Sequence, residues 1–187
     1  QLLIDQGHPI SYQKIDYWLD PSYPWDLISA NESFLARIES QNSGEVEENV
    51  VIKGAVCIGK GTVVRSGSYI VGPVIIGQDC NIGPNCYIRP STSIGDGCHI
   101  GAAVEVKNSI IMNNSDVPHH NYVGDSIIGE GCNLGAGTKI ANLRLDEQEI
   151  WVAGRNTRRR KLGAIIGDNV KTGINSSINI GSIIGNN

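Results

Sequence analysis

Residues 70–88 read Ile70-Val71-Gly72-Pro73-Val74-Ile75-Ile76-Gly77-Gln78-Asp79-Cys80-Asn81-Ile82-Gly83-Pro84-Asn85-Cys86-Tyr87-Ile88. An aliphatic residue occupies every sixth position of this stretch, and the same spacing continues on both sides. The full run has eleven such positions: Ile52, Ile58, Val64, Ile70, Ile76, Ile82, Ile88, Ile94, Ile100, Val106 and Met112. A period of six fits neither an amphipathic helix nor a hairpin strand and is typical of hexapeptide repeats. The sequence therefore predicts a mainly β protein, a parallel β-helix whose stacked coils share one apolar interior.

The repeat is interrupted twice. Its phase is lost after Met112 and returns two residues out of step, and a second break covers roughly residues 141–165. The second run of aliphatic positions contains Tyr122, Ile128, Leu134 and Ile140, and the third contains Ile166, Thr172, Ile178 and Ile184. We expect both breaks to be insertions that leave the solenoid as loops, and loops on a rigid scaffold commonly carry function. The solenoid domain is predicted to span residues 51–187.

Residues 1–50 are a different kind of sequence. They contain nine of the acidic and two of the basic residues, and six of the ten aromatic residues lie before residue 40. Pro24-Trp25-Asp26-Leu27 is typical of a helix start, with a proline first and an acid in the first turn. The polar, acidic residues 41–50 are predicted to be a linker. Residues 1–40 are then a separate, partly helical segment.

The cysteines are predicted to be core residues rather than disulfide partners or zinc ligands. Cys80, Cys86, Cys98 and Cys132 all fall on the small inward position of the repeat, where serine, threonine and valine also occur. Unpaired thiols favour the reducing cytoplasm. No apolar run is long enough to span a bilayer, and no basic stripe is interleaved with aromatic residues, so neither a membrane nor a nucleic acid is an expected partner. Because the chain ends inside a repeat, a capping element is expected beyond it.

The N-terminal segment resembles the end of a sugar-phosphate nucleotidylyltransferase domain. The resemblance lies in Trp18-Leu19-Asp20 and in the stretch from Pro24 to Asn31. It implies that Asp20 would bind Mg²⁺ in an intact domain of that family. The glycine-rich phosphate loop and the second metal carboxylate of that family are absent from these residues, and Pro21-Ser22 replaces the usual glycine. We therefore expect no metal site here, and Mg²⁺ only for the missing domain.

The solenoid resembles the acetyltransferase domain of bifunctional sugar-1-phosphate nucleotidylyltransferase/acetyltransferases, including N-acetylglucosamine-1-phosphate uridylyltransferase/glucosamine-1-phosphate acetyltransferase and archaeal counterparts. The resemblance covers roughly residues 51–185. The matching segments are Tyr87-Ile88-Arg89-Pro90, Val104-Glu105-Val106-Lys107-Asn108, His119-His120-Asn121-Tyr122-Val123-Gly124-Asp125, Asn133-Leu134-Gly135-Ala136-Gly137-Thr138 and Asn142. It implies a left-handed β-helix, a homotrimer with active sites shared between neighbours, and acetyl transfer from acetyl-CoA to an amino-sugar 1-phosphate such as glucosamine-1-phosphate.

The same resemblance assigns roles to individual residues. His119 would be the general base, with His120 as the near alternative, and the Ala136 amide would stabilise the thioester oxygen as it gains charge. Arg89 and Lys107 would hold the sugar phosphate, because they stand one coil apart. The resemblance also assigns Tyr122, Asn133, Asn142 and Lys161 to the sugar substrate and Ala136 to the coenzyme. Arg158 and Arg159 belong to a run of cations beside the expected phosphate site, and from that position they are expected to contact the phosphates of coenzyme A. Leu143 and Ile174 depart from the family pattern, which has Tyr and Ser at these positions.

One alternative remains open. The solenoid could be a non-catalytic oligomerisation and regulatory β-helix attached to a glucose-1-phosphate thymidylyl- or adenylyltransferase. The segment from His119 to Tyr122 favours catalysis, because a scaffold has no need for that motif.

Overall fold

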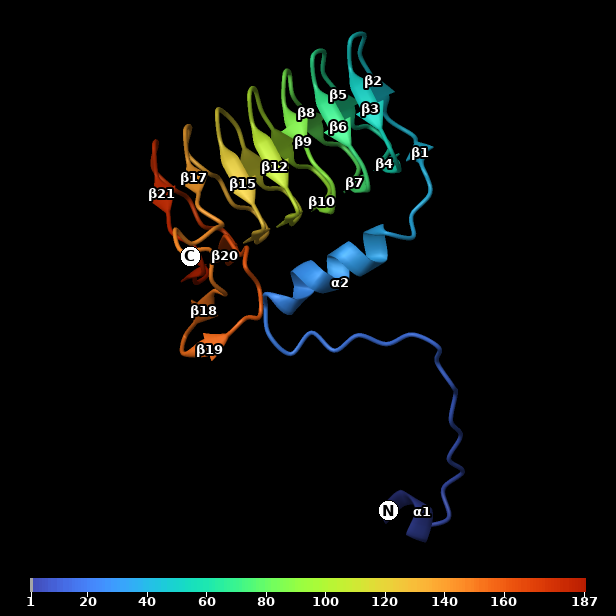
Figure 1. The fold of residues 1–187 in the computed structure, drawn as a ribbon. Helices are drawn as coiled ribbons and strands as arrows, with labels where there is room; N and C mark the ends of the chain where they lie inside the picture. The colour runs from blue at the N-terminus through green and yellow to red at the C-terminus, as the bar shows by residue number, and fades with distance from the viewer. Residues whose placement is uncertain (1) are drawn as a thin grey trace.

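Three parallel sheets wind into a left-handed β-helix in the computed structural model, which describes residues 2–187 (Figure 1). The eight-stranded sheet contains β1 (Gln41–Asn42), β4 (Val56–Ile58), β7 (Val74–Ile76), β10 (Thr92–Ile94), β13 (Ile110–Ile111), β16 (Ile127–Ile128), β20 (Ala164–Ile166) and β22 (Ser182–Ile184). The five-stranded sheet contains β2 (Glu45–Val46), β5 (Val63–Val64), β8 (Asn81–Ile82), β11 (His99–Ile100) and β14 (Asp116–Val117). The seven-stranded sheet contains β3 (Val51–Lys53), β6 (Tyr69–Val71), β9 (Tyr87–Ile88), β12 (Glu105–Lys107), β15 (Tyr122–Gly124), β17 (Lys139–Ile140) and β21 (Ser177–Ile178). The predicted fold class is confirmed.

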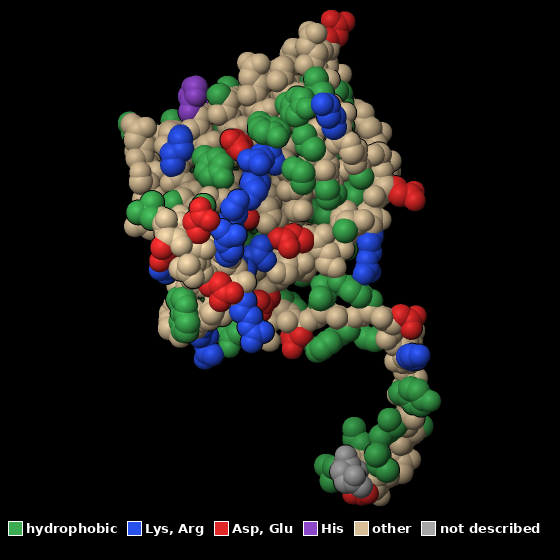
Figure 2. All heavy atoms as spheres, viewed as in Figure 1, with side chains coloured by type: hydrophobic (Ala, Val, Ile, Leu, Met, Phe, Trp, Pro, Cys, Tyr) green, Lys and Arg blue, Asp and Glu red, His purple; other side chains and the backbone are tan. Residues whose placement is uncertain are grey.

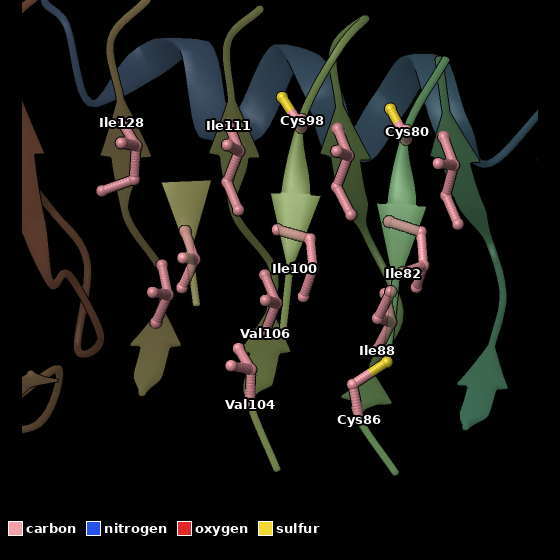
Figure 3. Packing of buried hydrophobic residues seen from close by; sticks show 14 of the residues in the cluster. Cys80, Ile82, Cys86, Ile88, Cys98, Ile100, Val104, Val106, Ile111 and Ile128 are labelled. Atoms are coloured by element: carbon pink, nitrogen blue, oxygen red, sulfur yellow. The ribbon is translucent and has the colours of Figure 1, made fainter. Parts of the chain in front are cut away.

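The register stacks equivalent repeat positions on one another. Ile58 pairs with Ile76, and Ile76 pairs in turn with Ile94. Successive side chains of a strand point to opposite faces, so side chains along each strand alternate between the interior and the outer surface. Figure 3 shows Ile82, Ile88, Ile100 and Val106 directed into this shared interior. The four repeat-position cysteines lie there too and are buried, as predicted.

The first break in the repeat is not an insertion, so that prediction was wrong. Ile94 pairs with Ile111, seventeen positions later, and Ile111 pairs with Ile128, again seventeen positions later. Two adjacent coils are therefore each one residue shorter than the coils before them. Ile111 is buried where the sequence pattern favoured Met112, which is exposed. Two missing residues shift the phase of a six-residue repeat as an insertion of four residues would. Residues 113–121 are therefore part of the solenoid and do not form a loop.

The two short turns lie side by side. One follows Val106 and the other follows Val123, and both residues are completely buried on the seven-stranded sheet. Val123, rather than Tyr122, therefore points inward in this coil, while Tyr122 is on the outer face. Both shortened turns connect the seven-stranded sheet to the eight-stranded sheet, so one edge of the solenoid differs from the other two.

The second break is an insertion, as predicted. The chain leaves the solenoid after β17 and returns at β20, and in between it forms an antiparallel hairpin of β18 (Trp151–Val152) and β19 (Arg155–Asn156). Ile150 and Val152 are buried in a small hydrophobic cluster outside the main core. The same cluster contains Trp25 and Ile28 from the N-terminal segment, so the insertion and that segment support each other.

A helix covers the outer face of the eight-stranded sheet. After α1 (Leu2–Asp5), residues 8–22 are exposed, and α2 (Asp26–Leu35) then runs along the coils (Figure 1). Asp26 accepts a hydrogen bond from the Tyr23 amide at 2.9 Å at the start of the helix. Ile28 and Leu35, seven residues apart, are fully buried on one helical face. The helix expected near Pro24 is confirmed, and it begins at Asp26.

Residues 41–50 are not a linker. Strand β1 pairs with β4, and β2 pairs with β5, so these residues form the first coil of the solenoid. Val46 and Val50 pack against the main core. An end coil has a neighbour on one side only, which is why it tolerates the polar and acidic residues that favoured the linker interpretation. The solenoid begins about ten residues earlier than the predicted boundary at Val51.

Candidate active site

The outer face of the seven-stranded sheet carries a column of polar residues. Tyr87 pairs with Glu105, and Glu105 pairs with Tyr122 on the next coil. Arg89 donates to Glu105 at 2.8 Å, and its guanidinium lies 5.5 Å from the centre of the Tyr87 ring. The hydrogen bond to Glu105 raises the pKa of Arg89. Arg89 is therefore a cation on this face that is already paired with one carboxylate.

Lys107 lies beside Arg89 on the adjacent coil, as the predicted coil length required. The Arg89 amide donates to the carbonyl of Val106 at 2.8 Å, which fixes the two strands in register. The Lys107 ammonium donates to Asp125 Oδ2 at 2.9 Å, and the Asp125 side chain is only 3% exposed. A buried carboxylate is stable when its oxygens are hydrogen-bonded and its charge is paired. Lys107 pairs the charge and donates to one of the two oxygens.

Asn142 reaches the same carboxylate from the start of the insertion. Its amide nitrogen lies 2.5 Å from Asp125 Oδ2 and 3.2 Å from the Tyr122 hydroxyl. Burial raises the pKa of Tyr122, so its hydroxyl keeps its proton near neutral pH. The structure thus brings Arg89, Lys107, Tyr122 and Asn142 together on this face.

His119 and Ala136 meet at the opposite edge of this sheet, in the corner that leads from the five-stranded sheet into the seven-stranded sheet. The carbonyl of His119 accepts a hydrogen bond from the Gly137 amide at 2.9 Å, which stacks the two corners on adjacent coils. The His119 side chain is exposed. Within residues 2–187, neither the His119 ring nor the Ala136 N–H makes a hydrogen bond. An exposed base therefore lies next to a free backbone donor.

His120 and Asn133 are placed differently. His120 has a left-handed backbone (φ 52°) and its carbonyl accepts a hydrogen bond from the Lys139 ammonium. Asn133 is exposed on the side of the five-stranded sheet, where its backbone pairs in parallel with Asp116 on one side and Lys171 on the other. Asn133 is therefore near the His119 corner, whereas Asn142 is at the other edge. One chain does not bring these two predicted sugar-binding residues together.

The insertion carries an open cationic cavity of about 590 Å³. It is lined by Leu143, Glu147, Arg158, Arg159, Arg160 and Lys161. The cavity adjoins the Asn142 cluster, because the carbonyl of Asn142 accepts a hydrogen bond from the Leu162 amide at 3.0 Å. Figure 2 shows Lys and Arg side chains gathered on one face of the molecule, interspersed with acidic ones. A cavity with this lining suits an anionic ligand.

The cations of this cavity are not equally available. Arg160 pairs with Glu147 at 2.7 Å, and both side chains are largely exposed. Arg159 turns toward α2, where it bonds Ser29 and Glu32, each at 2.7 Å. Arg158 and Lys161 have no ion-pair partner in the described part of the chain. Of the two predicted coenzyme-binding arginines, only Arg158 has a free guanidinium.

Asp20 lies in the exposed segment before α2. No group of three or more His, Cys, Asp or Glu side chains in residues 2–187 is arranged to hold a metal ion. No helix in the same residues is long and apolar enough to cross a membrane.

Sequence reasoning gave no role to the acidic members of the site. Asp125 and Glu105 stood inside the matching motifs, but their importance appears only when their partners are seen. Asp125 stands eighteen positions after Lys107, but the coil here is seventeen residues long and Gly124 is the residue that pairs with Lys107. Glu32 carried no signal from the repeat, because it comes from a helix outside it.

Residues 70–187 match the family model described as the GMPPB C-terminal domain. The chain belongs to this family. The residues that match the GMPPB C-terminal domain family make up most of the solenoid, including both edges of the seven-stranded sheet. The match begins within β6, so the first coils and the helix lie outside it.

Two curated relatives extend the match to nearly the whole chain. The bifunctional sugar-1-phosphate nucleotidylyltransferase/acetyltransferase of Sulfurisphaera tokodaii is 52% identical over 174 residues, which is 90% of this chain and 43% of that protein. The bifunctional protein GlmU of Methanococcus maripaludis (strain C7) is 47% identical over 188 residues, 99% of this chain and 46% of that protein. The chain thus spans less than half the length of these relatives. The predicted resemblance is confirmed.

Among solved structures, the chain is similar to PerB from Caulobacter crescentus in complex with CoA and GDP-perosamine. The sequence identity is 17%, the TM-score is 0.36, and the match covers 71% of this chain and 49% of that one.

Proposed function

We propose that the chain is an acetyl-CoA-dependent N-acetyltransferase acting on an amino-sugar 1-phosphate, with glucosamine-1-phosphate as the acceptor. The observation that carries the proposal is the stacking of exposed His119 next to the free amide of Ala136 on the adjacent coil. A non-catalytic solenoid has no use for this pairing. The names of the two bifunctional relatives support the same reaction class.

The proposed reaction needs one base and one hydrogen-bond donor. The amine nitrogen of the sugar attacks the thioester carbon of acetyl-CoA, the carbon–sulfur bond breaks, and CoA leaves as the thiolate, which becomes the thiol by taking the proton that His119 has accepted. His119 accepts the proton that the amine loses as the new bond forms. The Ala136 N–H donates to the thioester oxygen while it carries negative charge. No residue of the chain becomes acylated.

The phosphate of the acceptor would be held by Arg89 and Lys107. Both cations are paired with carboxylates, so each must leave or share its carboxylate to bind the phosphate. The Arg89–Glu105 pair is about one-third exposed on both sides, and such pairs are weak. Arg89 can therefore turn from Glu105 to a phosphate and bind it with two parallel hydrogen bonds. Lys107 has three donor hydrogens and uses one on Asp125, which leaves two for a phosphate.

The coenzyme would lie with its phosphates over the cationic cavity of the insertion. Arg158 and Lys161 are the free cations there, and Arg160 can leave its exposed partner Glu147. Arg159 is held by α2 and is the weaker candidate. Ile174 is 75% exposed on the last coils and offers the coenzyme an apolar contact where the family pattern has Ser. The residues present therefore fit a polyanionic thioester.

A homotrimer would complete the site. His119 and Ala136 lie on one edge of the seven-stranded sheet, and Lys107 and Asn142 lie on the other. When copies pack side by side in a ring, one edge of each chain meets the other edge of its neighbour. Asn133 and Asn142, separated within one chain, would then face the same acceptor.

The wider setting is proposed on the same basis. The intact protein would also be a sugar-1-phosphate nucleotidylyltransferase in nucleotide-sugar biosynthesis, with Asp20 as a Mg²⁺ ligand of that domain. All five cysteines are free thiols, which supports a reducing cytoplasm as its location.

The test is thiol release from acetyl-CoA in the presence of glucosamine-1-phosphate, followed with a thiol-reactive dye. We expect turnover by the wild type, and a smaller rate with unphosphorylated glucosamine. Arg89→Ala should raise the KM for glucosamine-1-phosphate more than it changes that for glucosamine. Sedimentation equilibrium should give three times the mass of the chain. A stable monomer without acetyl transfer would favour the non-catalytic scaffold of a nucleotidylyltransferase.

A further inference from the structure

A continuous chain of side-chain hydrogen bonds runs from α2 to the proposed acceptor site. Glu32 Oε1 accepts from the Asn108 amide at 2.8 Å, and the same Asn108 nitrogen donates to Asp125 Oδ1 at 2.8 Å. Asp125 Oδ2 accepts from Lys107 and from Asn142. These residues come from a helix, two adjacent turns and the insertion. They meet at the edge where the two coils are one residue short.

The charges along this chain balance. Lys107 offsets Asp125, and Arg159 offsets Glu32 at 2.7 Å. The neutral amide of Asn108 separates the two carboxylates and donates to both. Both neighbours of this nitrogen are carboxylate oxygens, which can only accept, so the orientation of the amide group follows from its partners. Arg159 and Lys107 are thus the cationic ends of one connected unit.

We infer that Asp125 is a positioning residue for acceptor binding and that Glu32 of α2 supports it through Asn108. This inference rests on the proposed function. Asp125 touches no substrate atom itself. It holds the Lys107 ammonium and the Asn142 amide in one place, so that both groups are aimed before the acceptor arrives.

Burial is what lets Asp125 do this. Its side chain is 3% exposed and accepts three side-chain hydrogen bonds, which leaves it no freedom to rotate. Lys107 is only 20% exposed, so its long side chain is confined as well. Fixing a flexible lysine before binding removes an entropic cost from the binding step. Removing the carboxylate would return that cost to the acceptor.

Glu32 connects the N-terminal segment to the proposed acceptor site. Glu32 is 76 positions from Asn108 in the chain and belongs to the segment that resembles the end of a nucleotidylyltransferase domain. The acceptor site of the solenoid is thus supported by residues on both sides of the predicted domain boundary. A shift of α2 would reach Lys107 through two carboxylates and one amide.

The test compares steady-state kinetics of Asp125→Asn, Glu32→Gln and the control Glu47→Gln in the full chain. Glu47 also accepts from an arginine, Arg65 at 3.1 Å, but it lies in the first coil. Hydrogen bonds to a charged group contribute enough that Asp125→Asn should raise the KM for glucosamine-1-phosphate about tenfold. Its kcat should change by less than about twofold, because no reacting group is altered.

The remaining variants separate positioning from general destabilisation. Glu32→Gln should raise the same KM by about threefold, since it removes one support and leaves Asp125 in place. Glu47→Gln should change neither constant. Because part of the effect of Asp125 passes through Lys107, the loss in the double variant with Lys107→Ala should be smaller than the sum of the two single losses. Glucosamine without phosphate should show a smaller effect in every case.

The outcomes distinguish a failure of the positioning role from a failure of the proposed function. Additive losses in the double variant, or an unchanged KM in both Asp125→Asn and Glu32→Gln beside an active wild type, would overturn only the positioning role. If Asp125→Asn does not fold, as judged by circular dichroism, the half-exposed Glu32→Gln decides alone. A folded wild type that releases no thiol would overturn the proposed function, and the inference with it.

Discussion

Replacing Gly124 by alanine should disturb the proposed site without disturbing the fold. A Cβ atom at this position would lie 2.6 Å from the Tyr122 hydroxyl oxygen and 2.7 Å from the Asn142 amide nitrogen. Both distances are too short for non-bonded contact. Both atoms are the ends of movable side chains, so the backbone of β15 can stay in register with β12. The two side chains must move apart instead.

The magnitude follows from the hydrogen bonds that such a movement breaks. Asn142 would lose its 3.2 Å contact with Tyr122 and loosen its 2.5 Å contact with Asp125. A neutral hydrogen bond contributes about 0.5–1.5 kcal/mol net, and one to a charged group about 1.5–3 kcal/mol. A loss of about 1.4 kcal/mol in acceptor binding corresponds to a tenfold change. We expect the KM for glucosamine-1-phosphate to rise about tenfold or more.

The assay is thiol release at varied glucosamine-1-phosphate, with thermal unfolding measured on the same samples. The matched control is Gly185→Ala, because a Cβ atom there meets nothing within 4 Å. Both variants should unfold near the wild-type temperature, and only Gly124→Ala should bind acceptor poorly. An unchanged KM in Gly124→Ala would refute the argument that Tyr122 and Asn142 must close over this glycine.

Three further predictions concern the base, the helix and the core. His119→Ala should lower kcat by about a hundredfold or more with unchanged thermal stability, as losses of a general base usually do; if His120→Ala has this effect instead, the motif is displaced by one residue. Trp25→Ala, at a site 5% exposed between α2 and the insertion, should cost about 3–5 kcal/mol in urea unfolding, and a cost below about 1 kcal/mol would contradict its role as an anchor. Cys80→Ser should cost about 1 kcal/mol. The neighbouring Cys98 thiol lowers the pKa of the Cys80 thiol, but Cys80 is 2% exposed, so iodoacetamide should label it only after unfolding; rapid labelling of the native protein would show that the coil opens.

The repeat could be predicted from the sequence because the buried aliphatic residues recur at a fixed spacing. An aliphatic residue every six positions has one stable arrangement, in which each coil places its side chains on those of the next. The same logic correctly placed Arg89 and Lys107 side by side. Both predictions depend only on the coil length, which the sequence contains.

The two errors in the fold have a common physical origin. A shift of phase gives the change in the number of residues between two runs only modulo six, so it does not show whether residues were added or removed. The pattern after Met112 therefore fitted an insertion and a pair of deletions equally well. Residues 41–50 were mistaken for a linker because an end coil needs fewer apolar side chains than a central one.

The site could be predicted only where its residues sit in the repeat or in a recognisable motif. Tyr122 and Asn142 stand in the matching motifs, but their contact through Asp125 depends on how the insertion folds back. Arg159 looked like a coenzyme ligand because it stands in a run of cations. The helix that takes its guanidinium lies 127 positions away from it in the chain.

The position of α2 along the coils has a consequence for how the solenoid unfolds. In a bare solenoid each coil contacts only its neighbours, so the ends fray and the middle opens coil by coil. Asn31 bonds Ser91 and Ser93 at β10, while Ile28 packs with Ile127 of β16, and these two strands do not pair with each other. The helix therefore ties together coils that would otherwise open separately. Amide exchange in the central coils should follow the undocking of one helix, as a single cooperative event.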